Sequence, residues 1–268
     1  MRAVPVNSNP VMPTQAARST VNRDWMHSDE HTTGPVTALA GYAGSEQTPS
    51  SQAERRVVNS PAYRFSYAIL KRAFDIALVL LFSPLWIPLC LSIALCVVLT
   101  SPGPVFFSHR RIGRGGVFFS MWKFRTMCVN SAEILEAHLA RHPEDRGEWA
   151  SSHKLKSDPR VTPLGRFLRR SSLDELPQLW NVLTGRMTLV GPRPIVAAEA
   201  EKYGDAFSYY LAVKPGITGL WQASGRSTLS YEDRVALDRR YVEEWSLAKD
   251  LSILIRTVTK VANSDGAY

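Results

Sequence analysis

The chain has 268 residues, of which 45% are hydrophobic and 21% charged, and its formal net charge is +8 at pH 7. This composition excludes a fully disordered chain, a collagen and a coiled coil, and three cysteines are too few for a disulfide-stabilised scaffold. Residues 1–60 carry five arginines and five acids, whereas residues 61–125 carry eight lysines or arginines and a single acid, Asp75. The basic excess therefore lies in one stretch of the chain, which also contains the longest apolar run.

The first 60 residues form the first of three predicted regions. They are rich in Ser, Thr, Ala, Pro and Gly and contain few large apolar side chains, so they cannot bury enough surface to form a core. Their opening lacks the apolar segment of a secretory signal peptide. We therefore predict a disordered N-terminal tail over residues 1–60, and the sequence suggests no role for it.

A long apolar run follows the tail. No charged residue occurs in residues 76–108. A helix over residues 76–99 would be about 36 Å long at ~1.5 Å per residue, enough to cross a bilayer core of ~30 Å. A single spanning helix is the simplest interpretation. However, Ser83-Pro84 and Pro88 lie near the middle of the run, and a proline inside a helix removes a backbone hydrogen bond and kinks or breaks the helix.

Basic residues flank this run on both sides. Because lysines and arginines favour the cytoplasmic side of a membrane, both ends of the run are expected on the same side. We therefore favour a re-entrant helical hairpin within residues 61–108, bent at Ser83, Pro84 and Pro88, and a kinked spanning helix remains the alternative. The flanking basic residues are Arg64, Lys71, Arg72, Arg110, Arg111 and Arg114.

Residues 109–268 are predicted to form a cytoplasmic, mainly helical domain, so the fold class is α+β. Two aromatic-rich runs within residues 103–126 flank Gly113–Gly116, a pattern typical of a small β-hairpin with a tight turn. Ser230 and Asp233 provide the start signal of a helix. Hydrophobic periodicity and turn residues predict helices over residues 130–150, 173–184, 231–245 and 247–262.

The last predicted helix places six apolar side chains on one face. This face could pack into the domain, or it could lie on a membrane surface, where Lys249, Arg256 and Lys260 would contact lipid headgroups. Both interpretations stay open from the sequence. The apolar residues are Leu247, Leu251, Leu254, Ile255, Val258 and Ala262.

Asp174 and Glu175 lie in the densest polar cluster of the chain. A purely structural interpretation is available, because Ser172 with Glu175 fits a capping box, acids stabilise helix N-termini and Pro177 suits a first turn. A chemical interpretation rests on basic residues that stand beside Gly or Pro elsewhere, since such positions can bind phosphate oxygens. These basic residues lie in the segments Lys123–Thr126, Gly191–Pro194 and Ser224–Arg226.

Carboxylates together with arginines suggest phosphate chemistry with a divalent metal. Mg²⁺ typically takes one or two carboxylates plus substrate phosphate oxygens, and a carboxylate can itself act as a nucleophile at phosphorus. The sequence contains neither of the Gly-rich nucleotide loops, GxxxxGK[ST] and GxGxxG. Nucleic acid is not expected as a partner, because the basic residues bracket a membrane segment, where anionic lipid headgroups are favoured.

The histidines and cysteines are weaker candidates for a site. His138 and His142 are four residues apart on a predicted helix, where two metal ligands could meet, but no third ligand completes the set. Cys90, Cys96 and Cys128 have no zinc-binding spacing and are interpreted as apolar side chains.

Six sequence segments between residues 68 and 268 carry a resemblance to a known family. In order they are KRAFDIALVLLFSPLWIP, GPVFFSHRRIGRGG, WKFRTM, DPRVTPLGRFLRRSSLDELPQLWNVLTGRMTLVGPRP, KPGITGLWQASGR and YVEEWSLAKDL. Together they resemble the bacterial sugar transferase family, the monotopic polyprenyl-phosphate phosphoglycosyl transferases. Within it, the chain is most similar to the exopolysaccharide-initiating transferases of the succinoglycan type, which use galactose.

The resemblance implies an activity and a location. Members of this family transfer a sugar-1-phosphate from a UDP-sugar to undecaprenyl phosphate at the cytoplasmic face of the bacterial inner membrane and release UMP. For this chain it favours a hexose, galactose or glucose, in the first step of exopolysaccharide or cell-surface glycan synthesis. Residues 109–268 would then be the catalytic domain, and downstream glycosyltransferases would be partners. The resemblance leaves the oligomeric state open.

The resemblance also implies roles for single residues. Asp174 matches the family's nucleophile, which forms a covalent aspartyl phosphosugar intermediate, and Glu175 matches the residue that helps to hold Mg²⁺. Ser83-Pro84 matches the bend of the family's re-entrant helix. An acid of the last helices matches Asp250 better than Asp238. The substrate- and phosphate-binding positions match Lys123, Arg125, Arg169, Arg193, Arg226 and Asp250.

Two other classes of function compete with this one. In a membrane-anchored assembly factor for polysaccharide synthesis, the acids would only cap a helix, and the complete set of acids and arginines argues against this. In a phosphodiesterase, water would resolve the covalent intermediate, and the placement beside a lipid-accessible segment argues against that.

Overall fold

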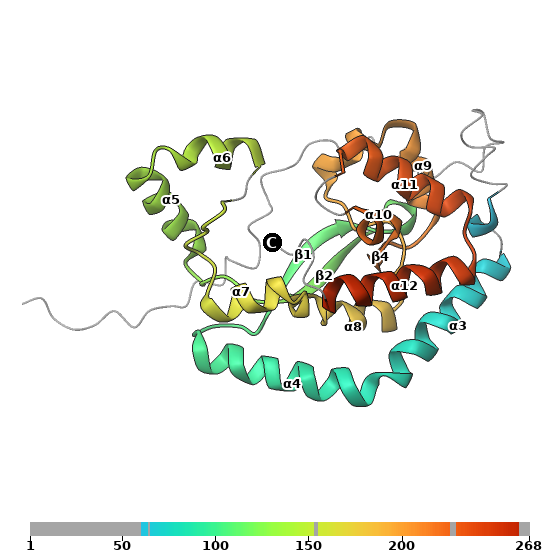
Figure 1. The fold of residues 1–268 in the computed structure, drawn as a ribbon, viewed down its shortest axis with the longest axis horizontal. Coiled ribbons are helices and arrows are strands. Elements are labelled where there is room, and N and C mark those ends of the chain that lie inside the picture. The colour runs from blue at the N-terminus through green and yellow to red at the C-terminus, as the bar shows by residue number, and fades with distance from the viewer. Residues whose placement is uncertain (1–59, 64, 153–154, 226–228, 263–268) are drawn as a thin grey trace, which may run out of the picture. The chain divides into compact units, whose positions relative to one another are not determined.

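The structure is a computed structural model that describes residues 60–63, 65–152, 155–225 and 229–262. This part of the chain is mostly helical and contains two small sheets (Figure 1). The mainly helical α+β class is therefore confirmed. The predicted tail, residues 1–60, lies outside the described residues except for Ser60, so its disorder stays a prediction, as do the proposed region boundaries.

The elements are named here as in Figure 1. The α-helices are α3 (Phe65–Leu81), α4 (Ser83–Thr100), α5 (Ser131–Arg141), α6 (Asp145–Ser152), α7 (Pro163–Arg170), α8 (Gln178–Leu183), α9 (Phe207–Ala212), α10 (Leu220–Ser224), α11 (Tyr231–Glu243) and α12 (Leu247–Ala262). The 3₁₀ helices are η2 (Pro61–Tyr63), η3 (Arg114–Gly116), η4 (Leu173–Glu175) and η5 (Ala197–Ala206). The strands are β1 (Phe106–Ile112), β2 (Phe118–Phe124), β3 (Thr188–Val190) and β4 (Gly216–Thr218).

The predicted hairpin within residues 103–126 is confirmed. Strands β1 and β2 pair antiparallel, with Phe106 opposite Phe124 at one end and Ile112 opposite Phe118 at the turn. The turn depends on glycine, because Gly115 and Gly116 adopt φ angles of 67° and 81°, a region that other residues enter only with strain.

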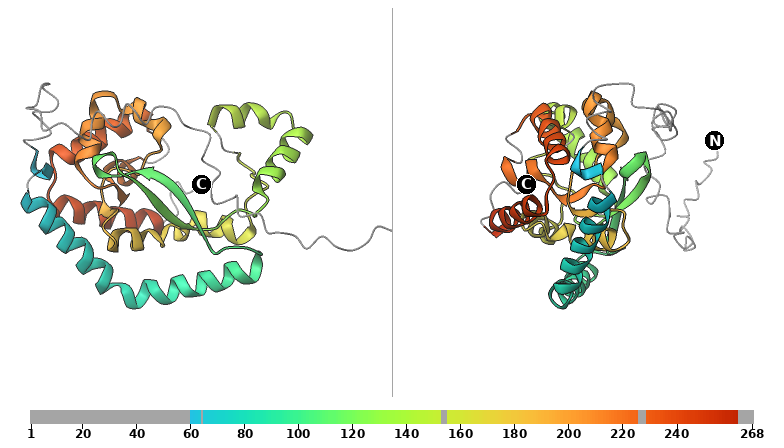
Figure 2. Two further views of the ribbon diagram at one scale, coloured as in Figure 1. Left: turned by 180° about the vertical axis from the view of Figure 1, so that it is seen from behind. Right: turned by 90° about the vertical axis from the view of Figure 1, so that its right-hand side faces the viewer.

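Helices α3 and α4 meet at an angle around Phe82 (Figures 1 and 2). Ser83 and Pro84 are the first two residues of α4, and the Ser83 hydroxyl donates to the carbonyl of Leu80 over 2.7 Å. Pro88 lies inside α4, which continues past it, because a proline removes only one hydrogen bond of the ladder. The structure thus places the break at Ser83-Pro84 and not at Pro88.

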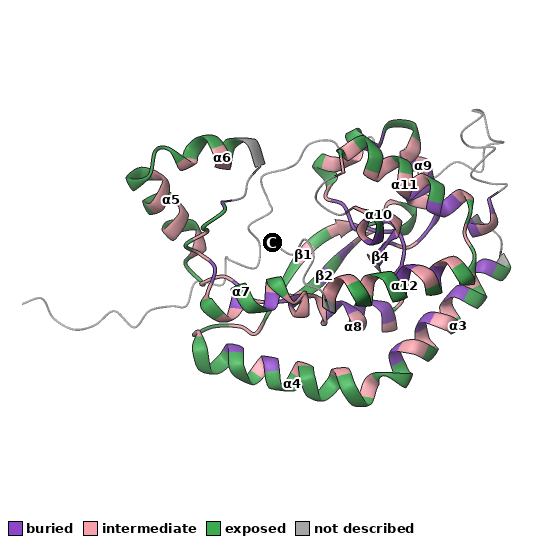
Figure 3. Cartoon of the chain, in the orientation of Figure 1, coloured by how far each residue is buried: buried purple, intermediate pink, exposed green. Residues whose placement is uncertain are grey.

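Helix α4 has the character of a membrane segment. Among the described residues it is the one helix long and apolar enough to cross a bilayer, with a mean hydropathy of 2.0 and only 11% of that window buried. Two of its residues, Ile93 and Val97, pack against Phe124 and Leu168. The remaining faces are apolar and uncovered (Figure 3). Length and composition alone leave re-entry as a prediction.

Two of the helix predictions need correction. The single helix expected over residues 130–150 is wrong, because α5 and α6 are separated at Pro143, whose ring and missing N–H interrupt a helix. The helix expected over residues 173–184 begins instead with the 3₁₀ turn η4 and becomes α-helical only at Gln178. It ends as predicted, with Gly185 at a φ of 78° just after it.

The last two helices follow the prediction closely. Helix α11 begins after Ser230, whose hydroxyl accepts a hydrogen bond from the N–H of Asp233 at 3.1 Å, as a helix cap should. Helix α12 spans Leu247–Ala262 and buries Ile253, whereas Leu251, Ile255 and Val258 are 50%, 56% and 68% exposed. Three of the six residues of its predicted apolar face are therefore exposed, whereas Leu254 packs against the core.

The short parallel pair β3 and β4 organises the core. Thr188 lies opposite Gly216 and Val190 opposite Thr218. A Cβ at position 216 would lie 2.1 Å from the backbone nitrogen of Gly191, so only glycine allows this approach. The surrounding core includes the fully buried rings of Tyr209, Tyr210 and Tyr241. This packing brings the segments after β3 and β4 side by side, and both segments contribute to the site.

Candidate active site

The two carboxylates lie on η4, the turn that joins α7 to α8. Ser172, just before this turn, adopts the left-handed conformation with a φ of 56°, and its side chain makes no capping hydrogen bond. The capping box that the sequence allowed for Ser172 and Glu175 therefore does not form. A left-handed serine costs about 1 kcal/mol or more, so the turn holds Asp174 and Glu175 in a conformation that helix capping does not explain.

Lys123 joins the two carboxylates from the end of β2. Its Nζ lies 2.7 Å from Glu175 Oε1 and 3.4 Å from Asp174 Oδ2. Asp174 is only 7% exposed. Burial raises the pKa of Asp174 and the charge of Glu175 raises it further, whereas Lys123 and Arg169 act in the opposite direction. The net effect is that the pKa of Asp174 lies above its ordinary value, and Lys123 makes this rise smaller.

Arg169 reaches the same site from the last turn of α7. Its Nε donates to the hydroxyl of Thr126 over 2.9 Å. Burial lowers the pKa of its guanidinium, and the charge of Asp174 opposes this effect. Helix α7 packs close to this segment because Gly165 has no side chain. A Cβ at this position would lie 2.1 Å from the Thr126 carbonyl oxygen. The hydroxyl of Thr162 caps the helix through the N–H of Gly165. The close packing of α7 against Thr126, just after the hairpin, thus positions Arg169.

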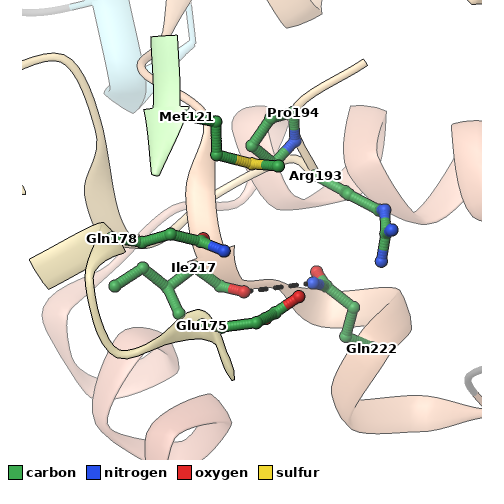
Figure 4. A pocket seen from close by; sticks show the side chains of 7 residues that line it. All are labelled: Met121, Glu175, Gln178, Arg193, Pro194, Ile217 and Gln222. Carbon is green, nitrogen blue, oxygen red and sulfur yellow. Dashed lines mark hydrogen bonds between the residues drawn. The ribbon is translucent and has the colours of Figure 1, made fainter. Parts of the chain in front are cut away.

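A small pocket opens beside Glu175 (Figure 4). Arg193 enters it from the segment after β3, and the Arg193 guanidinium lies 5.9 Å from the centre of the Trp221 ring. Gln222 Nε2 donates to the Ile217 carbonyl over 3.2 Å. The residues that line the pocket are Met121, Glu175, Gln178, Arg193, Pro194, Ile217 and Gln222.

The pocket includes side chains that the sequence analysis did not single out. Gln178 and Gln222 both present amide groups near Glu175, and Met121 forms an apolar wall (Figure 4). Gln178 stands three residues after Glu175 and Gln222 lies in the segment KPGITGLWQASGR, so both were within the segments that carry the family resemblance. Their type alone gave no signal, because glutamines are common on any surface.

Other predicted site residues lie elsewhere or cannot be placed. Arg125 donates to the carbonyls of Ser101 and Pro102 at 2.6 and 2.7 Å, after the end of α4, rather than to either carboxylate. Arg226 lies outside the described residues. The structure therefore brings Lys123, Arg169 and Arg193 to the acidic pair, and it gives Arg125 a different set of contacts.

Asp250 is also separated from the acidic pair. It has no exposed surface and contacts Lys71 at 3.0 Å, Tyr241 at 2.8 Å and Trp245 at 3.0 Å. Such a side chain leaves no surface for a substrate. Asp238, the less favoured match, is 2% exposed and accepts a hydrogen bond from Tyr203 at 2.9 Å.

The histidine pair does not assemble a metal site. His138 Nε2 lies 2.6 Å from Asp145, and His142 Nδ1 lies 3.1 Å from Glu144, so each ring has its own carboxylate. Within the residues that the structure describes, no three His, Cys, Asp or Glu side chains are placed to hold a metal ion.

Comparison with known proteins identifies the family. The family model for bacterial sugar transferases matches residues 66–264, which is most of the chain and contains the whole of the site. The chain belongs to the bacterial sugar transferase family. This agrees with the resemblance carried by its sequence segments.

Three relatives illustrate the range of the family. The chain is 48% identical over 217 residues, 80% of its length, to the undecaprenyl-phosphate galactose phosphotransferase of Salmonella typhimurium. It is 48% identical over 202 residues, 74% of its length, to the exopolysaccharide production protein ExoY of Rhizobium meliloti. It is 43% identical over 210 residues, 75% of its length, to the UDP-glucose:undecaprenyl-phosphate glucose-1-phosphate transferase of Escherichia coli.

These relatives differ in length. The matched region of the chain covers 44% of the Salmonella protein and 42% of the Escherichia coli protein, but 88% of ExoY. The chain therefore spans less than half the length of several curated relatives that it matches.

Proposed function

We propose that this sugar transferase moves a hexose-1-phosphate, galactose or glucose, from a UDP-sugar to undecaprenyl phosphate and releases UMP. The observation that carries the proposal is the contact of Lys123 with both Asp174 and Glu175, at the edge of a pocket that also receives Arg193. Relatives named for galactose and for glucose-1-phosphate transfer to undecaprenyl phosphate support the choice of substrates.

Asp174 is the proposed nucleophile. Its carboxylate oxygen forms a bond to the sugar-bearing phosphorus of the UDP-sugar while the bond from that phosphorus to the bridging oxygen breaks, and UMP leaves with the electron pair. An oxygen of the lipid phosphate then attacks the same phosphorus and releases the Asp174 carboxylate. Lys123 and Arg169 offset the repulsion between this carboxylate and the phosphates, and Arg193 is placed to contact phosphate oxygens from the pocket.

Mg²⁺ fits the donor set of this site. Glu175 lines the pocket with a side chain that is 30% exposed, so an oxygen of its carboxylate can reach a metal that also binds substrate phosphates. Glu175 is therefore the residue proposed to hold it. When bound, Mg²⁺ would neutralise phosphate charge that develops during transfer.

The apolar surfaces support a site at a membrane. Helix α4 is apolar and mostly uncovered, and Leu251, Ile255 and Val258 form an exposed apolar stripe on α12. We infer that α3 and α4 form a re-entrant hairpin in the bacterial inner membrane, with the catalytic domain on the cytoplasmic face. In that position the lipid phosphate and the carboxylates would lie at the same depth.

Topology can be tested with introduced cysteines after the three native cysteines are replaced by serine. With Ser51→Cys in the tail or Glu201→Cys in η5, a membrane-impermeant maleimide applied from the periplasm should label neither position until the cells are lysed. A spanning helix would instead expose the tail cysteine alone.

The break between α3 and α4 offers a second arm of the same test. The double variant Ser83→Leu/Pro84→Leu restores a backbone donor and should straighten the two helices into a spanning segment, so that Ser51→Cys becomes labelled. Pro88→Leu is the matched control and should leave labelling unchanged, because α4 already continues past this residue.

The covalent step can be tested without the lipid acceptor. With UDP-galactose or UDP-glucose and Mg²⁺, the enzyme should release no more UMP than one equivalent and gain the mass of one hexose phosphate on the peptide that contains Asp174. Continued UMP release would show that water resolves the intermediate, as in a phosphodiesterase. Absence of the adduct on rapid quenching, with UMP release only when both substrates are present, would show direct transfer instead.

Asp174→Asn tests the role of the nucleophile in full turnover. It should remain folded, because the isosteric amide removes a buried charge whose pKa is already raised. Loss of the attacking oxyanion should reduce turnover by about a thousandfold or more, since each ~1.4 kcal/mol of barrier is a tenfold change in rate. Glu232→Gln, an exposed acid on α11, is the control and should retain full activity. Substantial turnover by Asp174→Asn would contradict the proposal.

A further inference from the structure

Two basic side chains from distant parts of the sequence meet beside the end of α8, and a third lies near enough for its charge to act on one of them. Arg72 comes from α3, Arg114 from the hairpin turn η3 and Lys214 from the segment between α9 and β4. A Cβ built on Gly185 would lie 3.5 Å from Lys214 Nζ and 3.6 Å from Arg72 Nη2. The ammonium and the guanidinium therefore border the same spot on the surface.

This cluster lacks acidic side chains to balance it. Arg72 donates to the carbonyls of Val182 and Leu183 at the end of α8. Within the described part of the chain, the side chains of Arg114 and Lys214 form no ion pair or hydrogen bond. Burial lowers the pKa of Lys214, and the charges of Arg72 and Arg114 lower it further.

The nearest acid is already engaged. Asp75 acts weakly on Lys214 in the favourable direction, but its carboxylate contacts Lys71 Nζ at 2.9 Å and the N–H of Leu189 at 3.3 Å, and it also accepts from the hydroxyl of Thr188. Like charges held this close repel each other unless an anion stands between them. The structure supplies no such anion from its own described side chains.

The cluster is separate from the acidic pair. Lys123 pairs with Phe107 near one end of the hairpin, and Arg114 lies at the turn, beyond the Ile112–Phe118 pair. The five steps along the strand from Phe107 to Ile112 span about 17 Å at ~3.4 Å per residue. The catalytic lysine and the basic cluster thus occupy opposite ends of the hairpin.

The cluster also lies next to apolar surface. Ile69 and Leu70, on the same helix as Arg72, are 55% and 48% exposed. Helix α3 leads directly into α4, the apolar helix. Cations beside exposed apolar side chains match the boundary between lipid tails and phosphate headgroups.

We propose that Arg72, Arg114 and Lys214 form a binding site for a phosphate group, distinct from the catalytic pocket and filled by the headgroup of an anionic lipid. Arg72 and Lys214 flank the phosphate beside Gly185, where a longer residue would block the approach, and Arg114 completes the charge. The proposal does not depend on the transferase activity.

The test uses the full chain purified in a zwitterionic detergent. Arg114→Gln/Lys214→Gln removes two charges, and Arg72 is kept because it also holds the end of α8. Arg141→Gln on α5 is the matched control, since Arg141 is exposed and distant from the cluster in sequence. Circular dichroism and the melting temperature without added anion check that each variant is folded.

One arm measures lipid binding and the other measures free phosphate. Native mass spectrometry gives the affinity for phosphatidylglycerol over phosphatidylcholine, and thermal shift at constant ionic strength gives the response to inorganic phosphate against chloride. Each basic residue contributes about fivefold to anionic lipid binding, so the double variant should bind phosphatidylglycerol about thirtyfold more weakly. Arg141→Gln should bind it as the wild type does.

The two arms separate the sources of the phosphate. Loss of phosphatidylglycerol binding in the double variant, with no response of the wild type to inorganic phosphate, supports a lipid headgroup. A wild-type response to inorganic phosphate that the double variant loses, without lipid preference, would overturn the lipid assignment in favour of a soluble phosphate. Equal behaviour of the double variant and the wild type in both arms would overturn the site itself.

Discussion

Lys123 relieves a conflict between two like charges at the turn η4. Asp174 and Glu175 are adjacent in sequence. Burial raises the pKa of Asp174, and the charge of Glu175 raises it further. The lysine ammonium, at 2.7 and 3.4 Å from the two carboxylates, keeps this effect in check. In the proposed mechanism the carboxylate of Asp174 must be ionised to attack phosphorus, and Lys123 would help to keep it ionised.

The backbone of Ser172 offers a prediction at the scale of one residue. Its φ of 56° is one that glycine adopts without strain. Ser172→Gly should therefore keep activity and change the unfolding free energy by less than ~1 kcal/mol, whereas Ser172→Val should lose about 2 kcal/mol and reduce turnover by moving Asp174. Chemical unfolding and steady-state assays in detergent measure both effects.

The neighbouring Ser171 is the control for this prediction. It has a φ of −86° in the right-handed region, so Ser171→Gly brings no relief and should cost about 0.5–1 kcal/mol. If the hydroxyl of Ser172 were needed as a helix cap, Ser172→Gly and Ser172→Val would lose similar stability. Equal losses would contradict the backbone explanation.

At the scale of one element, helix α11 buries an acid that should make stability depend on pH. Burial raises the pKa of Asp238 to about 7, although the Tyr203 hydroxyl and the charge of Arg193 oppose the rise. Between the ordinary value of 3.8 and about 7, the folded protein keeps a proton that the unfolded chain releases. The contribution of Asp238 to stability therefore falls as pH rises through this window and becomes constant above it.

Asp238→Asn removes this dependence. The amide cannot ionise but can still accept the Tyr203 hydrogen bond, so the variant should unfold at a higher temperature than the wild type at pH 8 and at a similar temperature at pH 4. Three pKa units correspond to at most ~4 kcal/mol. Melting temperatures between pH 4 and 8 measure the effect.

Glu232→Gln is the control on the same helix. Glu232 is exposed in the first turn of α11, so its replacement should shift the melting temperature only slightly and by a similar amount from pH 5 to 8. If the curves of Asp238→Asn and the wild type ran parallel across the whole range, burial of an ionising Asp238 would be disproved.

At the scale of the whole molecule, a buried ionic network holds α3 against the core. Lys71 Nζ contacts Asp75 at 2.9 Å and Asp250 at 3.0 Å, and all three residues are at most 4% exposed. Asp250 also accepts hydrogen bonds from Tyr241 and Trp245. The network joins α3 to α11 and α12, so it links the helix that leads into the apolar helix α4 to the domain that carries the site.

Removing Lys71 should therefore destabilise the entire fold. Lys71→Met leaves two buried carboxylates without a cation, and breaking such a group costs about 3–5 kcal/mol. The double variant Lys71→Met/Asp250→Asn should lose less than the sum of the single variants, because one uncompensated charge is removed with its partner. Denaturant unfolding in detergent gives the three free energies.

Lys249→Met provides the matched comparison. Lys249 pairs with Glu244 at 2.8 Å on the surface, where Glu244 is half exposed, and such pairs contribute less than ~1 kcal/mol. A loss for Lys71→Met as small as that for Lys249→Met would show that the buried network does not hold α3 in place.

The sequence by itself determined the features that arise from local backbone chemistry. Gly115 and Gly116 form the hairpin turn, Ser83-Pro84 separates α3 from α4, and Ser230 begins α11, because each depends on the φ angle or hydrogen-bonding groups of a few neighbouring residues. The pair of acids, Asp174 and Glu175, was also visible, because the two residues are neighbours in the sequence. The break at Pro143 was equally local. The prediction of one helix over residues 130–150 did not take this proline into account.

Only the tertiary structure decided which distant side chains meet. Lys123 contacts acids that are more than 50 residues away in sequence, Asp250 is buried against Lys71 rather than presented to a substrate, and Lys214 joins Arg72 beside Gly185. The left-handed Ser172 belongs with these contacts, since surrounding packing must maintain its strained backbone. Charged residues look alike in a sequence, and their roles differ because the packing of helices and strands determines their neighbours and their exposure to water.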